Sequence, residues 1–242
     1  MGGRLTATYD AVVTPNHDLE QLYAYPTDLD RPWVRTDFVS TIDGAAWTAA
    51  GVSGKLGGEV DKRAFSMMRA LADVIVVGAG TARAEHYKAL TESSTDQAVR
   101  QRNGLAPIPV LVIVSNSLVI PEHLVAGGAV VVTCANSPEN FRSQLGDVIV
   151  AGDDDIDWAE VLNEFDRRGW RRVLCEGGPT LHGDLLTADV VDELCVTIAP
   201  TVSAGSAARI AQGSIPLDRP ARLGHAVAIN DVLLTRWVLD RS

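Results

Sequence analysis

The sequence is poor in cysteine, and the cysteines it has are isolated. Only three occur among 242 residues (Cys134, Cys175 and Cys195), far apart and each within an apolar run. No Cys-x-x-Cys pair and no Cys/His spacing typical of a zinc site is present, so we expect no metal. We interpret the three side chains as buried thiols of a protein from a reducing cytoplasm.

Positive charge and long hydrophobic runs are also scarce. The chain has 21 Lys and Arg against 31 Asp and Glu, and its formal net charge is −10. This balance argues against a partner with a phosphate backbone, although a small phosphorylated ligand needs only a few local donors. The apolar runs at 74–77 and 110–114 are far too short to span a membrane, and the N-terminus MGGRLTATYD lacks the core of a signal peptide. We therefore expect no nucleic-acid and no membrane partner.

The 46% of hydrophobic residues lie in short runs that alternate with amphipathic segments. Strands are predicted at 33–41, 73–77, 109–115, 128–133, 147–150, 171–175 and 190–200, and helices at 59–72, 137–145, 155–168 and 179–186. This alternation predicts an α/β fold with a mainly parallel sheet covered on both faces. Runs at 222–229 and 232–239, separated by Asn230-Asp231, predict a closing β-hairpin. Residues 1–32 are interpreted as an N-terminal arm and residues 33–242 as a single domain.

Two glycine-rich turns connect a predicted strand to a helix. In the first, Cys175 and Glu176 end a strand, Gly177-Gly178 follow, and Pro179 suits the first helical turn. Unpaired N–H groups and the helix dipole at such a turn favour a phosphate, and glycines let a flat ligand approach the backbone. The alternative is a tight structural turn. The second turn, 78–83, resembles the start of a GxGxxG fingerprint but has Arg83 at the third glycine, so it indicates a phosphate-facing turn rather than a standard Rossmann site.

Four stretches, in this order, carry a family resemblance: FVSTIDG (38–44), ADVIVVGAGTAR (72–83), LCEGGPTLHGDLL (174–186) and DELCVTIAP (192–200). Together they resemble the reductase (C-terminal) domain of the riboflavin biosynthesis protein RibD, over roughly residues 33–239. The resemblance implies a dihydrofolate-reductase-like three-layer sandwich, with a central mixed, mostly parallel sheet and a C-terminal β-hairpin. It also implies hydride transfer from NADPH to a heterocyclic substrate, and a homodimer with the late hairpin or a neighbouring strand at the interface.

The resemblance also assigns cofactor-binding residues by position. Those on the adenosine side would be Gly78, Gly80, Thr81 and Ala82. Those that meet the pyrophosphate and the nicotinamide ribose would be Gly177, Gly178, Thr180 and Leu181. Candidates for the 2′-phosphate are Ser115, Asn116 and Arg83, the last because a guanidinium offers bidentate phosphate binding.

On the substrate side, the resemblance points to Asp43 and Glu176 as the residues of the catalytic centre. Asp43 matches the acidic residue of the family's S-x-D-G motif and would orient the substrate; the alternative is an Asx-turn residue that caps its own loop. Glu176 lies at a strand end where α/β sheets place ligands, and the alternative is a solvated carboxylate that binds the following N–H groups. The substrate-binding candidates are Ser40, Asp43, Lys55 and Arg63.

The chain departs from the family pattern at two places. Family members usually carry a Lys before S-x-D-G, where this chain reads Arg35-Thr36-Asp37, and an Asp-Asn-Pro-like motif where it reads 85–88 (EHYK). No H-x-E or P-C-x-x-C motif of a zinc deaminase occurs, so we expect a separate protein to deaminate. The leading hypothesis is an NADPH-dependent reductase of riboflavin biosynthesis that reduces the ribosyl group of a phosphorylated diaminopyrimidine or aminouracil to ribityl. The alternatives are a dihydrofolate- or pteridine-type reductase and an NADP-binding protein without turnover.

Overall fold

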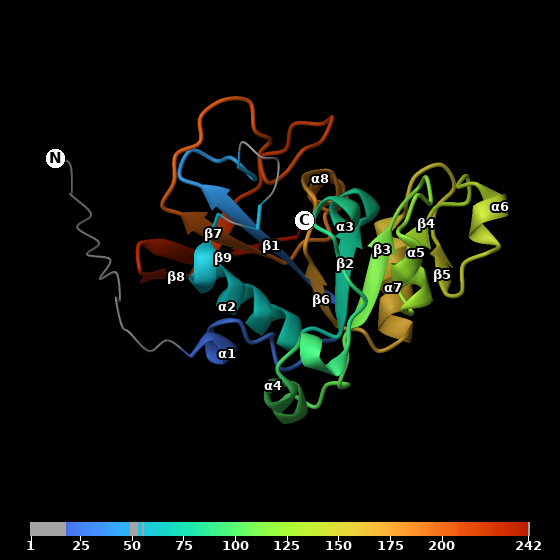
Figure 1. Ribbon diagram of the computed structural model, residues 1–242, viewed down its shortest axis with the longest axis horizontal. Coiled ribbons are helices and arrows are strands. Elements are labelled where there is room, and N and C mark those ends of the chain that lie inside the picture. The colour runs from blue at the N-terminus through green and yellow to red at the C-terminus, as the bar shows by residue number, and fades with distance from the viewer. Residues whose placement is uncertain (1–17, 49–52, 55, 242) are drawn as a thin grey trace.

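A single mixed sheet organises the protein. The structure is a computed structural model that describes residues 18–48, 53–54 and 56–241. Within these residues nine strands pair in the order β5-β4-β3-β2-β6-β1-β7-β9-β8 (Figure 1). Their bounds are β1 Trp33–Thr41, β2 Val74–Gly78, β3 Val110–Val114, β4 Val130–Thr133, β5 Val148–Val150, β6 Arg172–Cys175, β7 Glu193–Ala199, β8 Ala221–Ile229 and β9 Val232–Leu239.

Strands β1 to β7 run parallel to one another, whereas β9 pairs antiparallel with both β7 and β8. The hairpin turn places Asn230 and Asp231 at φ values of 48° and 66°, the left-handed conformation that a two-residue hairpin loop favours. The predicted mostly parallel sheet with a closing C-terminal hairpin is therefore confirmed.

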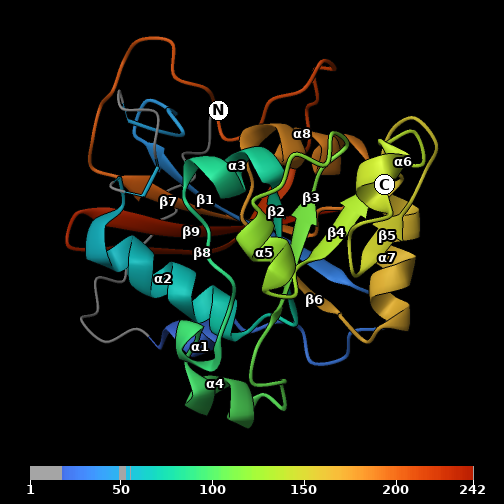
Figure 2. The ribbon, with the colours of Figure 1, turned by 45° about the vertical axis from the view of Figure 1, so that its right-hand side comes forward.

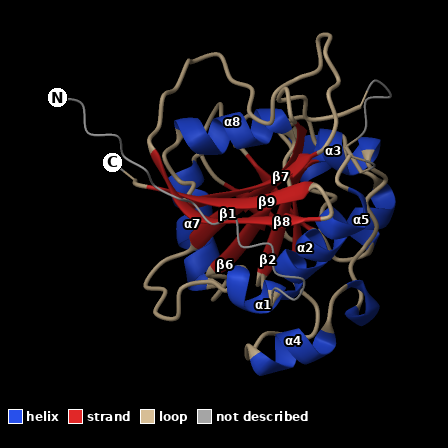
Figure 3. Cartoon of the chain, turned by 90° about the vertical axis from the view of Figure 1, so that its left-hand side faces the viewer, coloured by secondary structure: helices blue, strands red, loops and turns tan. Residues whose placement is uncertain are grey.

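Helices cover both faces of the sheet. Their bounds are α1 Leu19–Leu22, α2 Gly58–Ala70, α3 Ala79–Ala84, α4 Gln97–Arg102, α5 Glu122–Ala126, α6 Glu139–Arg142, α7 Trp158–Arg167 and α8 Pro179–Thr187, with a 3-10 turn at Glu92–Ser94. Figure 3 shows the sheet between α8 on one side and α2 on the other. None of the helices in the described ranges combines the length and the apolar character that a membrane span requires.

The strand β2 shows why helices cover both faces of the sheet. Because successive side chains of a strand point to opposite faces, Ile75 and Val77 join one apolar core with α2, while Val74 and Val76 join another with α7 and α8. All four side chains are at most 1% exposed. The three-layer α/β architecture predicted from the sequence is confirmed.

Residues 18–32 pack against the sheet through two tyrosines. Asp18 accepts hydrogen bonds from the first N–H groups of α1, which places Tyr23 and Tyr25 over the centre of the sheet. The Tyr25 hydroxyl donates to the carbonyl of Val173 at 3.2 Å, and the Arg35 guanidinium lies 4.0 Å from the centre of the Tyr25 ring. Residues 1–17 of the predicted arm lie outside the described residues, and the division at residue 32 stays a prediction.

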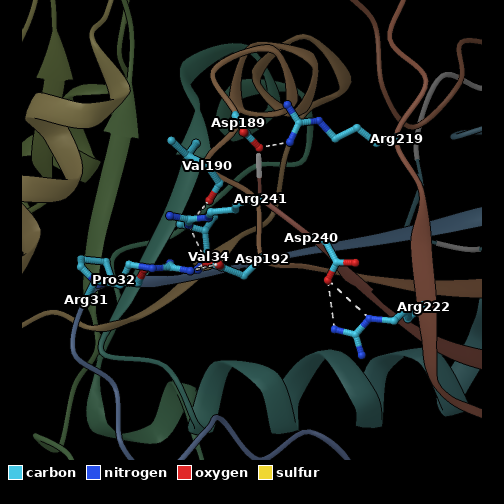
Figure 4. Close-up of polar contacts among 10 residues, drawn as sticks. All are labelled: Arg31, Pro32, Val34, Asp189, Val190, Asp192, Arg219, Arg222, Asp240 and Arg241. Carbon is cyan, nitrogen blue, oxygen red and sulfur yellow. Dashed lines mark hydrogen bonds and ion pairs between the residues drawn. The ribbon is translucent and has the colours of Figure 1, made fainter.

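A buried carboxylate connects the beginning and the end of the domain. Asp192, just before β7, accepts hydrogen bonds from Arg31 at 2.7 Å, from the backbone N–H of Val34 at 2.7 Å and from Arg241 at 2.6 Å (Figure 4). Its side chain is 2% exposed. The segment before β1 and the residues after β9 therefore meet at one charge.

Candidate functional site

Two cavities lie at the edge of the sheet where its parallel strands end. Figure 2 shows the arrows of β3 and β4 pointing toward the side on which α3 and α8 lie. One cavity, of about 650 Å³, lies beside the ends of β1 and β6, and we call it the first cavity. The second cavity, of about 790 Å³, lies beyond β2 and β3. Gly80 lines both, so the two spaces meet at the start of α3. Ligands of α/β sheets bind at this carboxyl edge.

The two predicted glycine turns contact each other between the cavities. The N–H of Gly78 donates to the carbonyl of Gly177 at 2.8 Å. Gly177 has φ 87°, and a Cβ built there would lie 2.9 Å from the ring of Phe38. A Cβ at Gly178 would collide with the hydroxyl of Thr81, whereas at Gly80 it would meet nothing within 4 Å. The paired turns form a shallow backbone cradle that side chains would fill.

The helix α8 directs its N-terminus into this cradle. Pro179 occupies the first helical position, as predicted. The first intrahelical bond runs from the N–H of His182 to the carbonyl of Gly178, so the N–H groups of Thr180 and Leu181 precede it. Both residues line the second cavity. Donors at the positive end of a helix dipole suit a pyrophosphate, so this end of the site fits the dinucleotide that the sequence predicted.

Most of the other predicted cofactor residues lie around the second cavity. Ser115 and Asn116 follow β3 and line it, together with Gly78 and Arg83. The Arg83 guanidinium donates to the carbonyl of Val119, which directs it along the wall of this cavity. Ala82 differs, because its side chain is 1% exposed, belongs to the apolar core and lines neither cavity. The structure thus brings together the glycine, serine and asparagine candidates and separates Ala82 from them.

Glu176 forms a buried ion pair on the wall of the first cavity. Its side chain is 1% exposed and accepts two hydrogen bonds from Arg69 and one from the hydroxyl of Tyr87, all at 2.6 Å. Burial raises the pKa of Tyr87 well above its usual range, and the Glu176 charge raises it further. The interpretation of Glu176 as a solvated carboxylate is wrong, because Arg69, 107 residues away, covers it.

The helix α2 presents a face to the first cavity on which the sequence indicated Arg69, as a possible ligand of a substrate phosphate, but not Asp61 or Phe65. Asp61, Phe65 and Arg69 follow one another at intervals of four residues and all line this cavity. The Arg69 guanidinium lies 4.3 Å from the centre of the Phe65 ring. Burial raises the pKa of Asp61, and a hydrogen bond from Thr197 lowers it in part. The helical spacing to Arg69 was the available signal for Asp61 and Phe65.

Asp37 is the second feature that sequence reasoning missed as a site residue. It lies on β1, lines the first cavity and is 9% exposed. Burial raises the pKa of the Asp37 carboxyl well above its usual range, and the nearby charges of Asp61 and Glu176 raise it further. The available signal was the departure at 35–37, where the family usually carries a Lys.

Asp43 is exposed and lines neither cavity. Its carboxylate accepts hydrogen bonds from the hydroxyl of Thr41, from the N–H of Ser203 at 3.1 Å and from the N–H of Ala204 at 2.6 Å. These bonds, the one from Thr41 first, lower the pKa of Asp43 to about 2. Asp43 thus holds the segment after β7 against the end of β1.

The remaining predicted substrate residues are not brought together. Ser40 is buried, and its hydroxyl donates to the carbonyl of Thr41 at 3.0 Å. Arg63 is exposed and lines neither cavity, whereas its neighbour Lys62 lines the first one. Lys55 lies outside the described residues.

The fold and these two cavities define a ligand-binding α/β protein whose site lies at the carboxyl edge of a mostly parallel sheet. Comparison with known proteins then identifies the family. The chain belongs to the RibD C-terminal domain family, which it matches over residues 32–234. The resemblance deduced from the four sequence stretches is confirmed.

Similar proteins of this family come from several organisms. The chain is 32% identical over 186 residues to the 2,5-diamino-6-ribosylamino-4(3H)-pyrimidinone 5′-phosphate reductase of Methanothermobacter thermautotrophicus, covering 74% of this chain and 82% of that protein. It is 28% identical over 188 residues to the riboflavin biosynthesis protein RibD of Escherichia coli, covering 74% of this chain and 50% of that protein. A crystal structure of a pyrimidine reductase-like protein from Corynebacterium diphtheriae superposes with a TM-score of 0.80 at 25% identity, covering 93% of this chain and 99% of that one.

Proposed function

We propose that this protein is an NADPH-dependent reductase of riboflavin biosynthesis that converts the ribosyl group of a phosphorylated aminopyrimidine to ribityl. The observation that carries the proposal is the pair of cavities that meet at the glycine cradle, one suited to a dinucleotide and one to a flat heterocycle. The reductases named among the relatives act on such a substrate.

In this proposal NADPH lies across both cavities. The N–H groups of Thr180 and Leu181 would hold the pyrophosphate, beside Gly78, Gly80 and Gly178. Ser115, Asn116 and Arg83 would bind the 2′-phosphate at the far end of the second cavity. When bound, NADPH supplies the hydride. The nicotinamide would then face the first cavity past Thr81 and Pro179, which line it.

The residues of the first cavity position the substrate and exclude water. Phe38 and Phe65 offer apolar surface to a heterocycle, and Lys62 and Lys88 place positive charge beside exposed parts of the wall, where a substrate phosphate would lie. The buried pair of Glu176 with Arg69 keeps the wall rigid, because each charge satisfies the other. We assign Asp43 a positioning role through the segment at 203–204, with Ser40 beside it. Arg63 and Lys55 stay predicted substrate residues.

The assay for this proposal follows NADPH oxidation at the absorbance band of the nicotinamide. Purified protein is mixed with NADPH and, in separate reactions, with each phosphorylated ribosylaminopyrimidine and with dihydrofolate. We expect oxidation with a ribosylaminopyrimidine. Oxidation with dihydrofolate alone would establish the pteridine-type alternative, and NADPH binding without oxidation in any reaction would establish a binding protein without turnover.

The proposed binding of NADPH at the glycine cradle is tested separately by the substitution Gly178→Ala. The added Cβ would collide with the Thr81 hydroxyl and narrow the cradle, so we expect the Kd for NADPH to rise about 10-fold, equivalent to about 1.4 kcal/mol. Gly146→Ala is the matched control, because a Cβ there meets nothing within 4 Å. Equal NADPH affinity of both variants, measured by nicotinamide fluorescence, would contradict the proposed course of the cofactor.

We also propose that the protein is cytoplasmic and forms a homodimer through β8. This strand lies at one end of the sheet, pairs only with β9 among the described strands, and exposes Leu223 to 44%. An unpaired edge with an apolar side chain is a template for strand pairing. Cys134, Cys175 and Cys195 are free and buried, which suits a reducing compartment. Light scattering of the native protein and of Leu223→Lys measures the oligomeric state; a dimeric variant would contradict the proposed interface.

A further inference from the structure

The carboxyl of Asp37 is the most unusual group of the first cavity. It is 9% exposed, and no described residue donates a hydrogen bond to it. A carboxyl taken out of water without donors is costly, so a native protein keeps one where a ligand satisfies it. Asp37 faces the space that the substrate would occupy.

Two arginines lie close enough to Asp37 to lower its pKa, but within the described residues neither donates a hydrogen bond to it. Arg69 donates to Glu176 from two of its three guanidinium nitrogens. Arg35 donates to Glu193 from Nε, and its two terminal nitrogens have no hydrogen-bond partner within the described residues. Asp61, also on the wall, adds a further negative charge. Phe38, Phe65 and Trp47 line the same space with aromatic rings. The interior therefore suits a flat ring that directs N–H donors toward Asp37.

The two ring types named for relatives differ in the edge that they would present. A 2-amino-4(3H)-pyrimidinone, as in the reductases of the archaeal relatives, carries a ring N–H and an adjacent amino group. These two parallel donors lie away from the ribosylamino group and match the two oxygens of a carboxylate. Because hydrogen bonds to the charged form favour it, they would lower the pKa that burial raises at Asp37 and keep its carboxyl ionised. A uracil, as in the bifunctional protein of Thermotoga maritima, carries a carbonyl oxygen in place of that amino group. Asp37 would then meet an acceptor.

We propose that Asp37 is the specificity-determining residue of this site and that it binds the ring N–H and the adjacent 2-amino group of a 2-aminopyrimidinone. This inference rests on the proposed reductase function and names its substrate class. The enzyme then reduces the ribosyl group while the ring still carries its 2-amino group. A hydrolytic deamination, in which water replaces that amino group and ammonia leaves, must follow the reduction.

The experiment compares kcat/KM for the 2-amino and the 2-oxo (uracil) forms of the phosphorylated ribosylaminopyrimidine, with NADPH at saturation. For the wild-type protein we expect a preference for the 2-amino form of about 100-fold or more, since the wrong ring leaves buried polar groups unpaired. In Asp37→Asn the side-chain amide offers one donor and one acceptor, so we expect the preference to fall at least 10-fold and the 2-oxo form to gain in relative terms. Asp240→Asn, an exposed carboxylate outside both cavities, is the matched control and should keep the wild-type preference.

The outcomes separate this inference from the proposed function. If the wild-type protein reduces both forms equally, or prefers the 2-oxo form, the inference is overturned while the reductase function stands. If Asp37→Asn lowers both kcat/KM values by the same factor, Asp37 is not the specificity determinant. If neither form is reduced, the proposed function itself fails. The ratio of kcat/KM for the 2-amino and 2-oxo forms is measured on the wild-type protein, so it does not depend on the folding of any variant. Thermal unfolding of Asp37→Asn verifies that this variant folds.

Discussion

Asp192 and Asp240 are aspartates in two different environments, one buried and one exposed. We predict that replacing them lowers the free energy of unfolding by very different amounts. Asp192 is 2% exposed and accepts hydrogen bonds from two arginines and a backbone N–H, whereas Asp240 is 68% exposed and pairs with Arg222, which is 69% exposed (Figure 4). The perturbation is a single replacement by alanine at each position. Both carboxylates pair with arginine, so the comparison sets a buried carboxylate with three donors against an exposed one with a single partner.

The structure sets the expected magnitudes. Asp192→Ala leaves the Val34 N–H buried without an acceptor and leaves Arg241, 22% exposed, without its partner. Removing one partner of a buried ion pair costs about 3 to 5 kcal/mol, and because Arg31 is 44% exposed we expect the lower end, about 3 kcal/mol. Asp240→Ala removes an exposed pair and should cost no more than about 0.5 kcal/mol, since solvent screens it.

Urea unfolding at pH 7, followed by the fluorescence of the five tryptophans, measures the free energy of unfolding of each variant. In a thermal scan the loss for Asp192→Ala corresponds to a decrease in Tm of about 6 to 12 °C. A loss below about 1 kcal/mol for Asp192→Ala, or one equal to that of Asp240→Ala, would refute the reasoning that burial decides the cost.

Three further predictions concern α8 and the end of β1. Burial lowers the pKa of His182 to about 4, so its neutral form favours the folded state, and this stabilisation is lost as pH falls from about 6.5 toward 4. Between pH 7.5 and 5 the free energy of unfolding should therefore fall by about 2 kcal/mol more for the wild type than for His182→Gln. Equal losses in the two proteins would contradict a buried neutral ring. Gly183→Ala would drive a Cβ into the backbone of Gln212 and should lower stability by about 1 to 3 kcal/mol, against no loss for Gly146→Ala, by urea unfolding. Asp43→Asn should lower kcat about 10-fold by releasing the N–H groups at 203–204, with the Kd for NADPH unchanged; an unchanged kcat would leave Asp43 as a turn residue.

Local pattern was sufficient for the elements and for the two glycine turns. The period of two in β7 and the helical period in α2 each report which side chains avoid water, and that information is local in the chain. Pro179 after a glycine pair likewise marks the start of α8 without reference to any other segment.

The local sequence pattern did not predict which side chains meet at the cavities. Glu176 meets Arg69 because β6 inserts between β1 and β2, an order that no single segment specifies. Asp43 was predicted to orient the substrate, yet its carboxylate turns to the segment at 203–204, which the chain reaches only after the whole parallel sheet is complete. Asp37 could be seen as a departure from the family pattern, but its burial depends on α2 lying over β1.

By itself, the sequence determined the α/β class, the mostly parallel sheet with its hairpin, the family and the glycine-rich turns at Gly78 and Gly177. Only the tertiary structure decided that Asp37 is a buried carboxyl to which no described residue donates, that Glu176 is neutralised by Arg69, and that Asp192 joins both ends of the domain. The physical reason is that hydrophobic periodicity records the burial of each segment, whereas the pairing and desolvation of a charge depend on which distant segments the strand order brings beside it.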